Sequence, residues 1–286
     1  MDATRLPRRP LGSSGLKVTP IGLAALSVGG PRRGLSPADV ERAFYELGVN
    51  TFLVHPMMKD LCEGVRRLVR GGHRDELVIA SEASIPLAGS VEKSLDKHLR
   101  ALETDHLDVW LLGWVRKRWY VREAVWSEMQ RERSAGKVRA LGFSAHDRKL
   151  ATELARELPV DVLMIRYNAA HRGAEREVFA EFAAPGRPGI IAYTATRWGM
   201  LMKPLPRRGF PEPMSGAECY RFVLQHPCVD LTWCAAGSFE ELREDVEGAL
   251  AGALPPERLE WIRRFGDAVH DASTGGRRWM FGSSAE

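Results

Sequence analysis

Two ionisable side chains, His55 and Glu82, follow apolar runs that are typical of neighbouring β-strands. His55 comes directly after Thr51–Val54, and Glu82 comes shortly after Leu77–Ala80. Burial raises the pKa of a carboxyl, and a nearby carboxylate raises the pKa of an imidazole, so such a pair shares a proton near neutral pH. The two residues are therefore predicted to form a general acid/base site. The alternative is an ion pair between Glu82 and an arginine such as Arg166, which would make the site structural.

Further polar and aromatic side chains stand at the ends of other apolar runs. The guanidinium groups of arginines could bind an anionic ligand through paired N–H donors, and aromatic rings could stack on a flat ligand. A structural role is an equal alternative for Arg166, and His146 could instead cap the helix that follows it. The predicted substrate-binding residues are Arg166, Asn168, Arg197, Trp198, Trp114 and His146.

The elements that must position these residues alternate between short apolar runs and amphipathic stretches. Eight strands separated by helices favour a parallel sheet closed into a (β/α)₈ TIM barrel, an α/β fold whose reactive residues lie at the carboxyl ends of the strands. Helices are expected over Ser36–Leu47, Leu61–Arg70 and Ser90–Leu102. The expected strands are Val18–Leu23, Thr51–Val54, Leu77–Ala80, Val109–Leu112, Ala140–Phe143, Val162–Ile165, Ile190–Tyr193 and Leu231–Cys234.

Length and pattern predict one domain over residues 1–286. Residues 6–18 carry a Gly-Ser-Ser-Gly turn and are expected to form a β-hairpin that closes the bottom of the barrel. Lys203–Met214 is long enough for a lid or binding loop, and residues 271–286 are expected to form a flexible tail.

Composition limits the function classes that fit this chain. It is 44% hydrophobic and has no apolar run of the length, about 18 residues, that a membrane span needs, so a cytoplasmic location without membrane contact is expected. The net charge of +4 is scattered, which argues against nucleic acid as a partner. Four cysteines without a C-x-x-C pair predict no metal site. We expect a small-molecule ligand and a monomer or dimer.

Several sequence blocks occur in one order along the chain. They read R-P-L-G-S-S-G-L-K-V-T-P-I-G-L, E-L-G-V-N-T-F, R-D-E-L-V-I-A-S, L-D-V-W-L-L and G-K-V-R-A-L-G-F-S. In order and spacing, from about Arg9 to about Leu250, the chain resembles the aldo-keto reductases. The resemblance implies the same barrel as the strand pattern does.

The resemblance also implies where carbonyl reduction would be carried out. The family uses Asp, Tyr, Lys and His, and the matching positions hold Leu53, Met58, Glu82 and Gly113. Met58 cannot donate a proton, and Glu82 would raise the pKa of a phenol that lysine lowers. The comparison therefore predicts that ordinary carbonyl reduction is lost.

The family's nicotinamide cofactor site is kept only in part. Ser144 and Tyr193 match residues that bind the nicotinamide, and they are the expected cofactor-binding residues. Gly237 and Asp245 stand where a basic residue for the 2′-phosphate and an Asn for the adenine are common. The prediction is that no cofactor is needed and that NADP or NAD binds weakly.

Three function classes stay open at this point. The first is a repurposed enzyme that performs non-redox acid/base chemistry on a small molecule, by cyclisation, isomerisation, elimination or hydrolysis. The second is an atypical NAD(P)H-dependent oxidoreductase that uses another acid, such as His55 or a water molecule. The third is a non-catalytic binding or partner protein, because fold does not fix chemistry.

Overall fold

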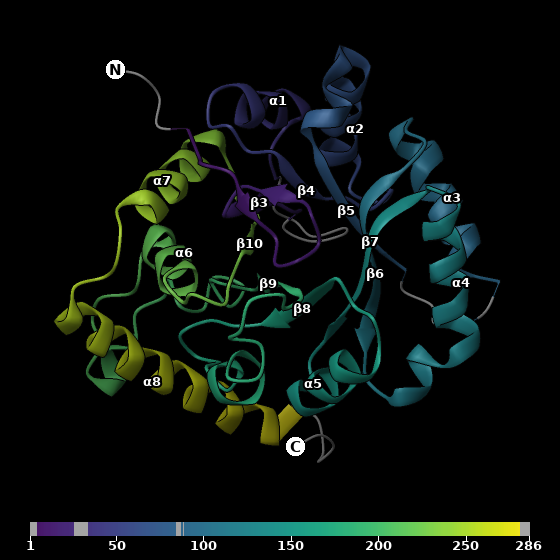
Figure 1. The fold of residues 1–286 in the computed structure, drawn as a ribbon. Coiled ribbons are helices and arrows are strands. Elements are labelled where there is room, and N and C mark those ends of the chain that lie inside the picture. The colour runs from purple at the N-terminus through teal and green to yellow at the C-terminus, as the bar shows by residue number, and fades with distance from the viewer. Residues whose placement is uncertain (1–4, 26–33, 84–86, 88, 281–286) are drawn as a thin grey trace.

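Eight parallel strands close into a barrel in the computed structural model, which describes residues 5–25, 34–83, 87 and 89–280, the last seven as backbone only (Figure 1). Each strand pairs with the next one along the chain, and the last barrel strand pairs with the first. The predicted TIM barrel is confirmed. The expected run Val18–Leu23 divides between two strands, because its end belongs to the barrel and Val18 to a hairpin. The barrel strands are β3 (Ile21–Leu23), β4 (Thr51–Leu53), β5 (Val78–Ala83), β6 (Leu107–Val115), β7 (Val138–Ala145), β8 (Val162–Arg166), β9 (Gly189–Tyr193) and β10 (Leu231–Cys234).

Helices form a ring around the barrel (Figure 1). Serine side chains begin two of them with capping boxes, since Ser36 and Ser215 each accept a hydrogen bond from the backbone three residues on. The three helices expected from the sequence are confirmed within a few residues at each end. The helices are α1 (Pro37–Tyr45), α2 (Lys59–Leu68), α3 (Val91–Leu102), α4 (Glu123–Ser134), α5 (Arg148–Glu157), α6 (Gly216–Leu224), α7 (Phe239–Leu250) and α8 (Pro256–Met280).

The core has two layers, one inside the barrel and one between the barrel and the helices. Strand β6 shows how alternation divides its side chains between them: Val109 and Leu111 belong to the inner cluster, and Trp110 and Leu112 to the outer one. Glu82 of β5 pairs in register with Leu111, so its side chain is on the inner face. Strand alternation thus aims this carboxyl into the barrel.

A short antiparallel hairpin, β1 (Arg9–Pro10) with β2 (Lys17–Val18), closes the end of the barrel opposite the strand exits. Its apolar residues, Leu11 among them, belong to the inner cluster. At Gly12, which has φ +51°, an added Cβ would lie 2.3 Å from the backbone nitrogen of Gly189, where β9 begins. Only glycine allows this approach, and the predicted plug is confirmed.

Two other expected segments differ from a free loop or tail. Helix α8 runs to Met280, so the part of the expected tail over residues 271–280 is helical, and residues 281–286 lie outside the described residues. Within the expected lid, Phe210 packs against Trp261 and Phe265 of α8 at ring distances of 5.8 and 5.4 Å. This contact fixes the middle of the loop to the helix.

All four cysteines are free and buried. Among the described residues, no helix combines the length and apolarity that crossing a membrane requires.

Candidate functional site

The carboxyl of Glu82 is the central feature of the barrel mouth. Its Oε2 atom is buried and has no hydrogen-bond partner in the described part of the chain, and the Ser144 side chain lies close enough to influence the pKa of the carboxyl. Burial raises the pKa of Glu82, and the Ser144 side chain offsets this only in part. A Cβ added at Gly113 would lie 3.2 Å from the carboxyl carbon and Oε2 of Glu82. The glycine therefore leaves the space that this carboxyl uses.

A β-bulge in β6 positions Ser144. The pairing of β6 with β7 changes register between Leu112 and Val115, and within this interval Trp114 has a left-handed backbone with φ 51°. The Trp114 backbone N–H donates to Ser144 Oγ at 2.8 Å. With this acceptor position filled, the Ser144 hydroxyl is free to donate to Glu82. Bulges of this kind re-aim side chains next to active sites, and the Trp114 ring is left 55% exposed.

Tyr193 and Arg166 pair in register at the ends of β9 and β8. The Tyr193 hydroxyl lies 3.3 Å from the carbonyl of Ala145 and 3.2 Å from Nδ1 of His146. Burial raises the pKa of Tyr193, and the charge of Arg166 opposes this shift while that of Glu82 adds to it. Tyr193 packs with the inner cluster and Arg166 pairs with it in register, so both side chains lie on the inner face of the barrel, as Glu82 does.

His146 contacts Tyr193 and does not cap the next helix. The side chain that caps α5 is Asp147, which accepts from Leu150 N at 3.0 Å. Burial lowers the pKa of His146, and the charge of Arg166 lowers it further. His146 is thus a neutral imidazole at neutral pH that can accept or donate one hydrogen bond at the mouth.

The loop after β9 is strained. Thr194, Arg197 and Trp198 have φ angles of 58°, 51° and 53°, in the left-handed region that non-glycine residues rarely adopt. The Trp198 ring is 63% exposed, whereas Arg197 is 6% exposed and donates to His171 and to Ser273 of α8. Such strain gathers at ligand sites, where the surrounding contacts hold it in place.

Asn168, a predicted substrate-binding residue, is fully buried. Its amide donates to the carbonyl of Thr194 at 2.8 Å and accepts from Ala170 N at 3.0 Å. The side chain therefore joins the loops after β8 and β9. In this structure its contacts are structural, and its role toward a ligand stays a prediction.

His55 lies against a helix outside the barrel. Its ring packs edge-on against His98 of α3 at 4.9 Å, and His98 in turn packs against Trp110 at 5.1 Å. Burial, followed by the charge of Lys97, lowers the pKa of His55. No hydrogen bond or ion pair joins His55 to Glu82 within the described ranges. The structure thus brings Glu82 together with Ser144 and Tyr193, but His55 with His98.

The start of α7 is where the sequence resemblance would place the 2′-phosphate of a nicotinamide cofactor. Here the Gly237 N–H donates to the carboxylate of Glu241 at 2.8 Å, and Glu240 adds a second acidic side chain in the first turn. Burial, followed by the charge of Glu241, raises the pKa of Asp245 to about 7. The backbone N–H of Gly237 is thus already bound by an acidic side chain, and Gly237 itself offers no positive charge. These residues do not fit a 2′-phosphate.

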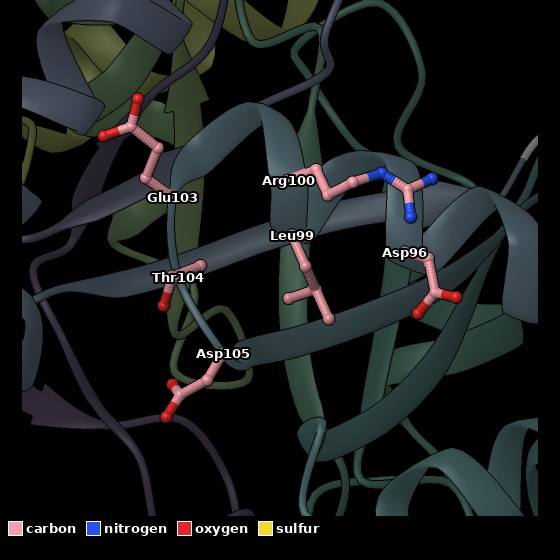
Figure 2. A pocket seen from close by; sticks show the side chains of 6 residues that line it. All are labelled: Asp96, Leu99, Arg100, Glu103, Thr104 and Asp105. Atoms are coloured by element: carbon pink, nitrogen blue, oxygen red, sulfur yellow. The ribbon is translucent and has the colours of Figure 1, made fainter.

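A separate groove of about 490 Å³ lies on the outside of the barrel, along α3 and the turn that follows it (Figure 2). Its lining ends at Asp105, two residues before β6 begins, and so reaches the amino ends of the strands, opposite the mouth. Acidic side chains dominate the lining, and Glu103 is paired with Arg70. Since barrel active sites lie at the carboxyl ends of the strands, this groove is set apart from the candidate site.

Comparison with known proteins now adds to this geometry. The sequence profile of the aldo/keto reductase family matches residues 63–218, more than half of the chain. The chain belongs to the aldo/keto reductase family. No curated protein matches it.

Solved structures of aldo-keto reductases share this fold. The chain is similar to aldo-keto reductase AKR11C1 of Bacillus halodurans in its holo form, with 18% identity and a TM-score of 0.75 over 91% of this chain and 96% of that one. It is also similar to PA4992 of Pseudomonas aeruginosa, a candidate aldo-keto reductase, with 23% identity and a TM-score of 0.69 over 87% of this chain and 97% of the other. At these identities the likeness shows the fold alone.

Proposed function

We propose that this aldo/keto reductase family member binds a small organic molecule at the barrel mouth and transfers a proton there through Glu82. The observation that carries the proposal is a buried carboxyl with one oxygen, Oε2, left without a partner in the described chain. A buried group of raised pKa keeps its proton at higher pH than an ordinary glutamate, which suits a general acid. Cyclisation, isomerisation, elimination and hydrolysis can each be catalysed by such a group.

The surroundings of Glu82 support ligand binding. Trp114 and Trp198 are exposed side chains on strained backbone, and Tyr193 adds a third aromatic side chain beside Arg166. Exposed aromatic side chains offer contact area to a flat ligand. Because the strained loops already hold them in place, binding orders them little further. We assign the proton to Glu82 and not to His55, because His55 packs against His98.

The proposal extends to the loss of hydride transfer. The positions that the resemblance gives to Asp and Tyr hold Leu53, which packs with the inner cluster, and Met58, which packs with the outer cluster. Neither side chain can donate a proton. The acidic start of α7 further supports weak binding of NADPH, and we expect no more than trace oxidation of NADPH with aldehydes or quinones.

The experiment follows proton transfer directly. The protein is incubated in D₂O with a panel of small metabolites, and deuterium uptake is read by mass spectrometry, with NADPH oxidation measured in parallel. We expect a compound whose exchange falls by about 10²-fold or more in Glu82→Gln, the loss typical of a missing general acid or base. His55→Gln is the matched control and should retain exchange. Exchange that survives Glu82→Gln, or NADPH turnover in the usual range of an aldo-keto reductase, would overturn the proposal.

A further inference from the structure

A second hollow lies beside the mouth, where the exits of β7, β8 and β9 meet α8. Its volume is about 640 Å³, within the range of roughly 300–1,000 Å³ that is common for small-molecule sites. Four segments far apart in the sequence build it: the start of α5, the end of β8 with the loop that follows, the loop after β9, and α8. We call it the arginine pocket, after the six arginines of its lining, Arg148, Arg166, Arg172, Arg176, Arg197 and Arg263.

Positive charge dominates the arginine pocket. Against six guanidinium groups, its lining holds two carboxylates, Glu175 and Asp267. Asp267 is bound by Arg172 at 2.8 and 3.0 Å, and Glu175 lies 3.3 Å from Arg263. Arg148 is likewise bound by Glu177, just outside the lining, at 2.6 Å. These pairs hold three of the six arginines in fixed directions. The lining as a whole keeps a positive balance.

The pKa of His171 reflects the positive charge inside the pocket. Its pKa is lowered to about 3, by burial first and then by the charges of Arg166 and Arg197. The imidazole is therefore neutral at all ordinary pH values, and its Nδ1 is 3.1 Å from the guanidinium of Arg197. An anion bound here would weaken the repulsion that keeps His171 unprotonated.

We infer that the arginine pocket binds a small molecule that carries a phosphate or diphosphate group. Arginine presents parallel N–H donors that match the oxygens of a phosphate, and several arginines can share its two negative charges. A simple inorganic phosphate would fill only part of the volume, which leaves room for an organic portion. The inference does not rest on the chemistry proposed for Glu82, although Arg166, which pairs with Tyr193 in register, places the pocket next to the mouth.

Calorimetry of the whole protein with inorganic pyrophosphate tests the inference, with phosphate and citrate as comparison ligands at constant ionic strength. We expect one pyrophosphate per chain, with weaker binding of phosphate and of citrate. Arg263→Gln and Arg176→Gln should each weaken pyrophosphate binding about tenfold or more, the loss of a charge-assisted hydrogen bond. Arg176 is exposed, so its replacement tests the charge even where another variant unfolds.

Arg156→Gln is the matched control, because Arg156 carries the same charge on α5 and pairs with Glu181 outside the pocket. The affinity of Arg156→Gln for pyrophosphate should change by less than about twofold. Equal losses in the control and the pocket variants would show unspecific attraction and overturn the inference. Tighter binding of citrate than of pyrophosphate, or no binding at millimolar pyrophosphate, would do the same. Glu82→Gln should bind pyrophosphate as the wild type does, which separates this test from that of the proposed function.

Discussion

Glu82 and Gly113 occupy adjoining strands and compete for one volume. The resemblance to the aldo-keto reductases places a lysine and a histidine at these positions, whereas here a carboxyl of β5 uses space that any side chain at 113 would enter. A side chain at position 113 would therefore have to displace the carboxyl of Glu82. This coupling can be measured as a free energy.

Gly113→Ala should lower the free energy of unfolding by about 1–3 kcal/mol, the usual cost of overpacking. In a Glu82→Ala background the same change should cost less, and the difference should be about 0.5–3 kcal/mol, as for contacting residues. Urea unfolding of the four proteins gives both numbers. Gly34→Ala is the control, because a Cβ at Gly34 meets nothing within 4 Å. Additive effects of the two substitutions would contradict the shared volume.

The direction of the Glu82 side chain could be predicted from the sequence, whereas that of His55 could not. Glu82 lies within a strand, so alternation determines which way its side chain points. His55 follows the end of β4 at Leu53, and beyond a strand end the alternation no longer applies. The sequence pattern therefore does not determine which way the ring of His55 points. Nothing in the sequence around His98 of α3 indicates that the two rings pack together.

At the scale of elements, regular patterns were predictable and irregular ones were not. The eight strands and the hairpin follow from hydrophobic period and turn residues, and all were found. The bulge at Trp114 and the left-handed turn at Trp198 carry no such signal, because tryptophan is a poor choice for positive φ. They depend on contacts between distant segments, such as the hydrogen bond from Trp114 to Ser144.

The acidic start of helix α7 predicts weak binding of NADPH. Because Glu241 already binds the Gly237 N–H, titration calorimetry with NADPH should show no saturable binding at micromolar concentrations. Glu241→Gln removes the negative charge and should strengthen NADPH binding measurably. Glu247→Gln, a similar charge change later in the same helix, is the control. Sub-micromolar affinity of the wild-type protein for NADPH would contradict this view of α7.

At the scale of the molecule, Asp245 links stability to pH. Its folded pKa of about 7 lies above the unfolded value of about 3.9, so the protonated carboxyl stabilises the fold at low pH. As pH rises from about 4 to about 7, the unfolded chain ionises first and this contribution is lost, by a few kcal/mol at most. Asp245→Asn should remove this decline.

The measurement is urea unfolding of wild type and Asp245→Asn at several pH values between 4 and 8. The difference between the two curves should grow in favour of the variant as pH rises, and should level off above about 7. Asp75→Asn, at an exposed position, should show no such trend. A pH-independent difference for Asp245→Asn would contradict the raised pKa.

The closure of the barrel also decides when the chain can fold during its synthesis. The guanidinium of Arg9 donates to the carbonyl of Asp230 at 2.6 Å across 221 positions, and β3 needs β10 as its neighbour. Among the barrel strands, β3 is made before its neighbour β10, and that edge of β3 stays unpaired until β10 is synthesised. Long-range closure of this kind slows folding and exposes strand edges to aggregation.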